Sequence, residues 1–76
     1  MRIANYVAFG TLGYLMTNEQ QLNIYYCCMG RFEKQIFYGS YGDLQKNVVL
    51  YDGLGKMRVN HIESDDGIIV IGVEKV

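Results

Sequence analysis

Residues Tyr6–Leu12 read Tyr-Val-Ala-Phe-Gly-Thr-Leu, an apolar run that meets a glycine at position 10. A short apolar run of this kind predicts a buried strand, here over Ile3–Phe9. Gly10 then permits a bend where a side chain would clash, and such a bend can turn backbone N–H groups toward a ligand. The candidate ligand-binding residues are therefore Phe9, Gly10, Thr11 and Leu12.

Five later segments have the composition of β-strands. Leu22–Met29 is rich in β-forming residues, Lys56–Glu63 alternates between two faces, and Ile68–Ile71 is β-branched throughout. Gly72, within the last strand, suggests a bulge or a close approach of another segment. The expected strands are Leu22–Met29, Lys34–Tyr38, Asn47–Tyr51, Lys56–Glu63 and Ile68 to Val76.

Turn-forming residues separate these segments. Ser64–Gly67 is the clearest hairpin turn, Gly39–Asp43 is a loop with two glycines, and a short helix is expected within Leu12–Gln21. With 76 residues the chain forms one compact domain, residues 1–76. We expect a mainly β (α+β) fold, a small curved sheet or partly open barrel. It would hold five or six mostly antiparallel strands and one short helix.

Tyrosine is frequent in this chain, with seven in 76 residues. A small core cannot hide them all, so some are expected on a surface that meets a protein partner or a second copy. The alternative is that tyrosine, being amphipathic and β-favouring, simply lines strand faces. The candidate partner-binding residues are Tyr25, Tyr38 and Tyr41.

Charge and hydropathy limit the classes of partner that the sequence favours. The net charge is −1, and the seven basic residues are scattered along the chain, which disfavours nucleic-acid binding unless several copies converge. The apolar stretch near the N-terminus is too short to span a bilayer, and Arg2 with this stretch resembles a signal peptide only faintly. A cytoplasmic location is expected, or the host cytoplasm if the protein is viral.

The chain carries no complete catalytic constellation. Adjacent residues Cys27 and Cys28 point to opposite faces of a strand, which favours two reduced thiols over a disulfide; a reactive thiol is the alternative. His61 is the only histidine and has no partners at metal-ligand spacing. We therefore expect no metal, no cofactor and no catalytic residues.

Three segments together resemble the gamma-glutamylcyclotransferase-like family. These are Phe9–Leu12 with Asn18 and Leu22 behind it, Leu50–Gly55, and Asp66–Val76. The resemblance implies that backbone amides of the glycine turn hold a gamma-glutamyl group whose amine then attacks its own carbonyl. The family's acid follows the last strand, and neither Glu63 nor Glu74 occupies that position. The resemblance therefore implies ligand-binding residues and no catalytic carboxylate.

Two other segments resemble the motifs of Sm-like RNA-binding proteins. Asp43–Leu50 matches the first motif, and Met57–Ile62 matches the second except that Val59 replaces the glycine expected after the arginine. This resemblance implies a ring of subunits that cradles uracil bases.

The most favoured function is non-enzymatic binding by contact. A short, tyrosine-rich, nearly neutral chain without an active site is typical of small viral, phage or mobile-element accessory proteins that inhibit a host factor. The alternatives are a cyclotransferase-like ligand binder or enzyme at Gly10 and an Sm-like oligomeric RNA binder.

Overall fold

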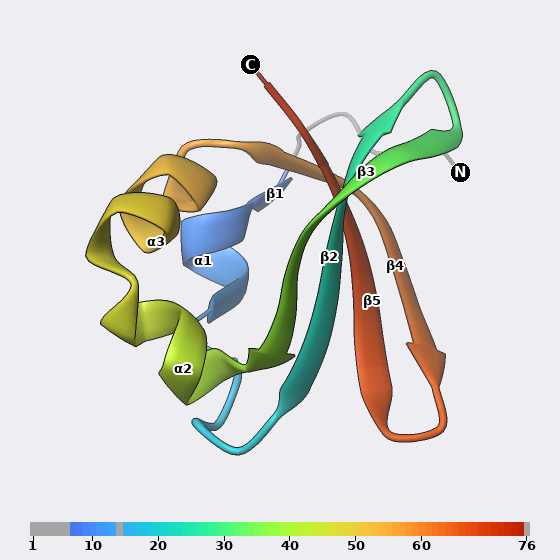
Figure 1. Cartoon of the computed structure of the whole chain (residues 1–76). Helices are drawn as coiled ribbons and strands as arrows, with labels where there is room; N and C mark the ends of the chain where they lie inside the picture. Colours follow the sequence, from blue (N-terminus) through green and yellow to red (C-terminus); the bar gives the residue numbers. More distant parts are fainter. Residues whose placement is uncertain (1–6, 14, 76) are drawn as a thin grey trace.

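The computed structural model describes residues 7–13 and 15–75 and is a small α+β protein (Figure 1). Along the chain the elements are β1 (Val7–Ala8), α1 (Phe9–Gly13), β2 (Gln21–Cys28), β3 (Arg31–Ser40), α2 (Tyr41–Lys46), α3 (Val48–Gly55), β4 (Arg58–Asp65) and β5 (Ile68–Glu74). In the described part of the chain, no helix has the length and apolar character needed to cross a membrane.

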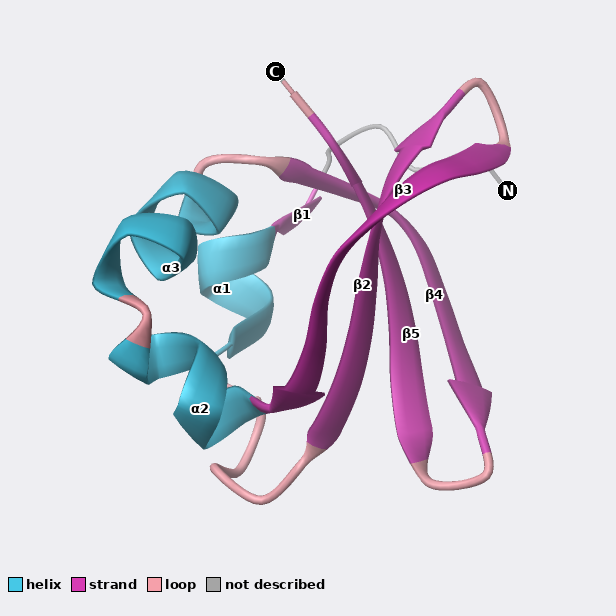
Figure 2. Ribbon diagram, viewed as in Figure 1, coloured by secondary structure: helices cyan, strands magenta, loops and turns pink. Residues whose placement is uncertain are grey.

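The strands form one mixed sheet in the order β1-β4-β5-β2-β3. The two hairpins, β2–β3 and β4–β5, are antiparallel, and they join through the parallel pair β2–β5 at the centre. The two-residue strand β1 pairs antiparallel with the start of β4. The three helices lie together on one side of the sheet, and no helix of the described residues covers the other side (Figure 2).

The expected fold class is confirmed in outline, as a mostly β protein with mainly antiparallel pairing. The finer expectation was wrong in two respects. The sheet has four long strands and the two-residue β1 where five or six strands were expected, and there are three helices where one was expected. The outermost strands β1 and β3 do not pair with each other, so the sheet is open. Because the helices cover only one face, closure into a barrel is not needed to build a core.

The strand expected at Asn47–Tyr51 was wrong, because this segment forms the start of α3. Asn47 is the N-cap, and its side chain accepts a hydrogen bond from the Leu50 amide at 3.3 Å. The β-branched residues Val48 and Val49, which suggested a strand, are 70% and 85% exposed, so their side chains contribute little to the packing of the protein. Leu54 instead anchors the helix in the core.

The strand and glycine turn expected around Phe9 are also corrected. Of the strand expected over Ile3–Phe9, positions 3–6 lie outside the described residues and Val7–Ala8 forms β1. Phe9 is not in a strand, because α1 begins there. Gly10 is a helical residue that lies against Gly55 of α3: a Cβ at Gly10 would meet the Gly55 carbonyl oxygen at 3.3 Å. Its lack of a side chain therefore serves the close packing of two helices.

The loop expected at Gly39–Asp43 was wrong, because Gly39 and Ser40 end β3 and α2 begins at Tyr41. The short helix expected within Leu12–Gln21 lies earlier, as α1.

The Ser64–Gly67 turn and the close approach at Gly72 are confirmed. The β4–β5 hairpin turns at Asp66 and Gly67, with φ of 54° and 82°. Gly72 is both a close approach and a bulge site: a Cβ there would lie 2.8 Å from the Cys27 Cβ, and the β4 register shifts opposite it, around Asn60. No larger residue fits between these strands.

The core lies between the helices and one face of the sheet. It contains side chains from β2, β4, β5 and all three helices: Phe9, Leu22, Ile24, Tyr41, Leu44, Leu54, Val59, Ile71 and Val73. Because Leu22, Ile24, Ile71 and Val73 point toward the helices, the alternate residues of β2 and β5 point away from them. The sheet therefore presents a second face that no described helix covers.

Candidate functional site

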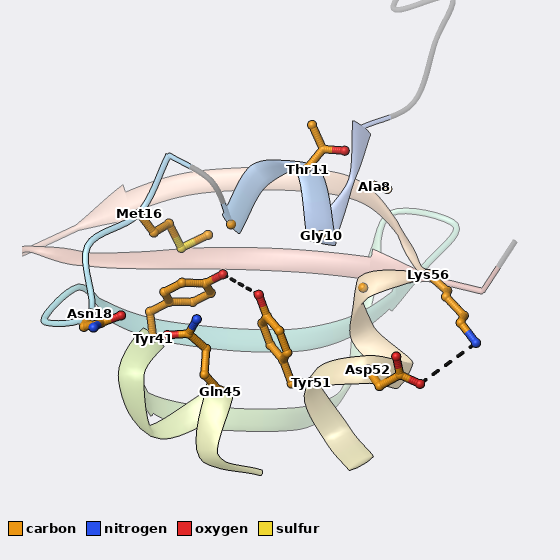
Figure 3. A pocket seen from close by; sticks show the side chains of 12 residues that line it. Ala8, Gly10, Thr11, Met16, Asn18, Tyr41, Gln45, Tyr51, Asp52 and Lys56 are labelled. Carbon is orange, nitrogen blue, oxygen red and sulfur yellow. Dashed lines mark hydrogen bonds and ion pairs between the residues drawn. The ribbon is translucent and has the colours of Figure 1, made fainter. Parts of the chain in front are cut away.

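The first candidate is a groove of about 590 Å³ on the helical side of the molecule (Figure 3). Residues from α1, α2, α3 and the loop before β2 surround it. Its walls include Gly10, Thr11, Gly13, Met16, Asn18, Tyr41, Gln45, Tyr51, Asp52, Gly55 and Lys56.

Two tyrosines form the floor of this groove. The hydroxyls of Tyr41 and Tyr51 are hydrogen-bonded at 2.7 Å, and the rings meet edge to face with centroids 5.9 Å apart. A Cβ at Gly13 would lie 2.3 Å from the Tyr41 hydroxyl, so this glycine makes room for the buried ring. The main role of the tyrosine pair is therefore to hold α1, α2 and α3 together.

The ligand-binding residues predicted from the sequence divide between the core and the groove. Phe9 is fully buried, its amide donates to the Met57 carbonyl at 3.0 Å, and Leu12 packs against the core. Gly10 and Thr11 do line the groove. The charged pair at its rim, Asp52 and Lys56, is 4.0 Å apart and largely exposed, which gives weak attraction in water.

The second candidate is the uncovered face of the sheet, which we call the open face. Strand alternation and register place its side chains as follows: Asn23, Tyr25 and Cys27 on β2; Phe32, Gln35 and Tyr38 on β3; Ile68, Val70, Gly72 and Glu74 on β5; Arg58, His61, Glu63 and Asp65 on β4. The hydrogen bond from Gln35 Nε2 to Asn23 Oδ1, 2.8 Å, confirms that these two share a face.

An aromatic cluster of Tyr25, Phe32 and His61 crosses the open face. The Tyr25 and Phe32 rings stack with centroids 5.0 Å apart, and His61 meets Phe32 edge to face, also at 5.0 Å. Phe32 is nevertheless 47% exposed, and Tyr38 on the same strand is 57% exposed. Mutual packing holds these rings in place without hiding them from solvent.

A shallow hollow of about 390 Å³ lies beside the aromatic cluster. Phe32 and His61 line it together with Glu74, whose carboxylate is bound to the Arg58 guanidinium at 3.1 Å and to the Asn60 amide at 3.2 Å. The His61 Nε2 lies 2.6 Å from a Glu63 carboxylate oxygen. The aromatic surface is thus bordered directly by acidic groups.

The predicted partner-binding tyrosines do not form one set. Tyr25 and Tyr38 lie on the open face, but Tyr41 is only 5% exposed and belongs to the core and the groove floor. Tyr41 is therefore not an exposed anchor. Phe32, which the sequence prediction did not include, is the exposed ring that stacks on Tyr25, and its position opposite Cys27 follows from the register of the β2–β3 hairpin.

Both cysteines are free thiols, and they occupy different environments. Cys27 is buried and Cys28 is half-buried. Burial, aided by the nearby Glu74 carboxylate, raises the pKa of the Cys27 thiol. Since the thiolate is the reactive form, the environment of Cys27 is that of a packing residue. Among the described residues, no group of three or more His, Cys, Asp and Glu side chains could hold a metal ion.

Thiol labelling is expected to distinguish the two cysteines. At pH 7.5 (about one unit below the ordinary cysteine pKa), iodoacetamide should modify Cys28 about tenfold or more faster than Cys27. The Cys28→Ser variant should lose the fast phase and keep the slow one, as followed by intact mass. A fast phase that survives in Cys28→Ser would contradict the burial of Cys27.

Comparison with known proteins adds no relatives: the chain matches no protein-family model, no curated protein and no solved structure. The cyclotransferase-like and Sm-like resemblances therefore stay hypotheses, and the case for a function depends on the geometry of the two candidate sites.

Proposed function

We propose that this protein is a non-enzymatic protein-binding module that uses the open face of its sheet as the contact surface. The observation that carries the proposal is the aromatic cluster: Phe32 remains 47% exposed although Tyr25 and His61 hold its ring in place. Aromatic side chains with fixed positions are typical anchors of protein interfaces, because they bury large areas at little cost in conformational entropy.

The shape and composition of the open face support a protein partner. Apolar and aromatic groups, including Tyr25, Phe32 and the nearly buried Val70, lie on β2, β3 and β5, and exposed carboxylates lie on the neighbouring β4. Aromatic and apolar groups with polar groups beside them are the usual composition of a protein interface. The carboxylates would repel the phosphates of a nucleic acid, which supports a protein over an RNA.

Docking on the face is favoured over strand addition at the edge. The outer strand β3 pairs irregularly with β2: the partners jump from Phe37 to Gln35 and from Lys34 to Phe32, which leaves Ile36 and Glu33 as extra residues. Bulges and charged residues on an edge strand oppose the pairing of a further strand. The side chains of the face are thus a better contact surface than the backbone of β3.

Substitution of Phe32 tests the proposal. Immobilised wild-type protein, Phe32→Asp and Val49→Asp are compared in capture from an extract of the source cells or of their host, followed by titration with the purified partner. Phe32→Asp should weaken binding about 30-fold or more, the effect of losing an interface anchor. Val49→Asp is the matched control, because Val49 is 85% exposed on α3, on the helical side.

A folding control and a second variant make the outcome of this test clear. Thermal unfolding of each variant shows whether it is folded, and Tyr38→Ser, at a position 57% exposed, gives a second and milder change on the same face. A partner that binds wild type, Phe32→Asp and Tyr38→Ser equally well would refute the proposed contact surface.

A further inference from the structure

Charge is distributed unequally between the two sides of the sheet. On the open face, Glu63 and Asp65 of β4 form an exposed acidic column on one side of His61, and the partly buried Glu74–Arg58 pair lies on the other side of His61. The lysines lie elsewhere: Lys34 and Lys75 line a hollow on the helical side, and Lys46 and Lys56 belong to or adjoin α2 and α3. Among the described residues, Arg58 is the one arginine or lysine that register places on the open face.

The acidic column adjoins the aromatic cluster. His61 packs against Phe32 and contacts the Glu63 carboxylate, so only one side chain separates the exposed ring from an exposed carboxylate. Phe32, His61 and Glu74 also line the hollow of about 390 Å³. A lysine or arginine side chain from a partner can lay its stem on the ring while its charged end meets a carboxylate.

We infer that the partner docks a cationic segment on the open face, with lysine or arginine side chains next to apolar ones. This inference rests on the proposed function and adds the chemistry of the partner. A second copy of this chain is a poorer fit, since Arg58, the one cation that register places on each described open face, is already paired with Glu74 and does not meet Glu63 and Asp65 of the other copy. Opposite charge across an interface mainly raises the association rate and the specificity.

Two labelled peptides test the inference by fluorescence anisotropy. The probes are a ten-residue peptide of alternating valine and lysine and the same peptide with glutamate in place of lysine. The lysine peptide should bind the wild-type protein, with an affinity that falls as salt rises, and the glutamate peptide should not bind. Equal binding of both peptides, or no binding of the lysine peptide, would overturn the inference.

Paired variants separate a specific contact from net charge. The double variant Glu63→Gln/Asp65→Asn should weaken binding of the lysine peptide about three- to tenfold. Asp43→Asn/Asp52→Asn removes the same charge from α2 and α3 and should change binding less than twofold. Equal losses in the two double variants would mean that the peptide responds to net charge alone, and this too would overturn the inference.

The same variants distinguish this inference from the proposed function. If a captured partner is lost with Phe32→Asp but is unaffected by Glu63→Gln/Asp65→Asn, the open face binds a partner without cationic contacts, and only the inference fails. If Phe32→Asp leaves the captured partner in place, the proposed function itself fails.

Discussion

Replacing Gly72 with valine is expected to lower the free energy of unfolding by about 3 kcal/mol or more. A Cβ at this position would lie 2.8 Å from the Cys27 Cβ and 3.0 Å from the His61 Cβ, so it would meet strands on both sides of β5. Neither contact is the far end of a flexible side chain. The strands must separate, and the sheet loses pairing at its centre. Urea unfolding followed by circular dichroism measures the change.

Gly53 is the matched control for Gly72. It lies inside α3, and a Cβ there would meet nothing within 4 Å. Gly53→Ala should therefore stabilise the protein by up to about 1 kcal/mol, since alanine is the better helix former. A Gly72→Val variant as stable as wild type would show that β2, β4 and β5 do not approach as closely as described.

Truncating Leu54 to alanine should cost about 2–5 kcal/mol, the usual effect of a buried leucine. Leu54 is 1% exposed and connects α3 to the core beneath it. A domain of this size has a total stability of roughly 4–11 kcal/mol, so the loss lies between about a fifth of it and all of it. The urea midpoint should fall steeply, and the unfolding slope should stay unchanged if unfolding remains two-state.

Val49 provides the comparison for Leu54 within the same helix. Because Val49 is 85% exposed, Val49→Ala should change stability by no more than about 0.5 kcal/mol. This pair also tests the assignment of α3. In a strand over 47–51, the β-branched Val49 would be expected to pack on one face of the sheet, so equal effects of Leu54→Ala and Val49→Ala would contradict the helix.

Local sequence signals predicted the hairpins and the central strands well. The Asp66–Gly67 turn needs two consecutive positive φ angles, which Asp-Gly supplies, and the β-branched residues after it form β5 as expected. The close approach at Gly72 could be predicted because glycine is unfavourable inside a β-branched strand, so its presence there indicates a steric requirement. These features depend on neighbours in sequence or on one residue type.

The helical layer could not be predicted by the same means. Val48 and Val49 favour a strand locally, but the position of α3 is decided by the burial of Leu54 against the sheet. Two capping signals were available: Ser40, whose hydroxyl accepts from the Asp43 amide at 3.1 Å, and Asn47. Likewise, Gly10 suggested a turn because its real neighbour, Gly55, is distant in sequence.

The candidate site was half predictable. Tyr25 was expected on the strand Leu22–Met29 and does lie on β2, but which face of the sheet stays uncovered depends on where the helices lie. Tyr41 was expected to be exposed because Gly39–Asp43 suggested a loop, but Tyr41 begins α2 and its side chain packs inward. Phe32 emerged only from the β2–β3 register, which contains two irregularities that the sequence does not reveal.

The proposal that the open face binds a protein is tested most directly by the ring resonances of tyrosine and phenylalanine in nuclear magnetic resonance spectra of the complex. On addition of the purified partner, the resonances of Tyr25, Phe32 and Tyr38 should shift, while those of Tyr41 and Tyr51, on the helical side, should stay in place. Shifts confined to Tyr41 and Tyr51 would contradict the account and assign binding to the groove between the helices.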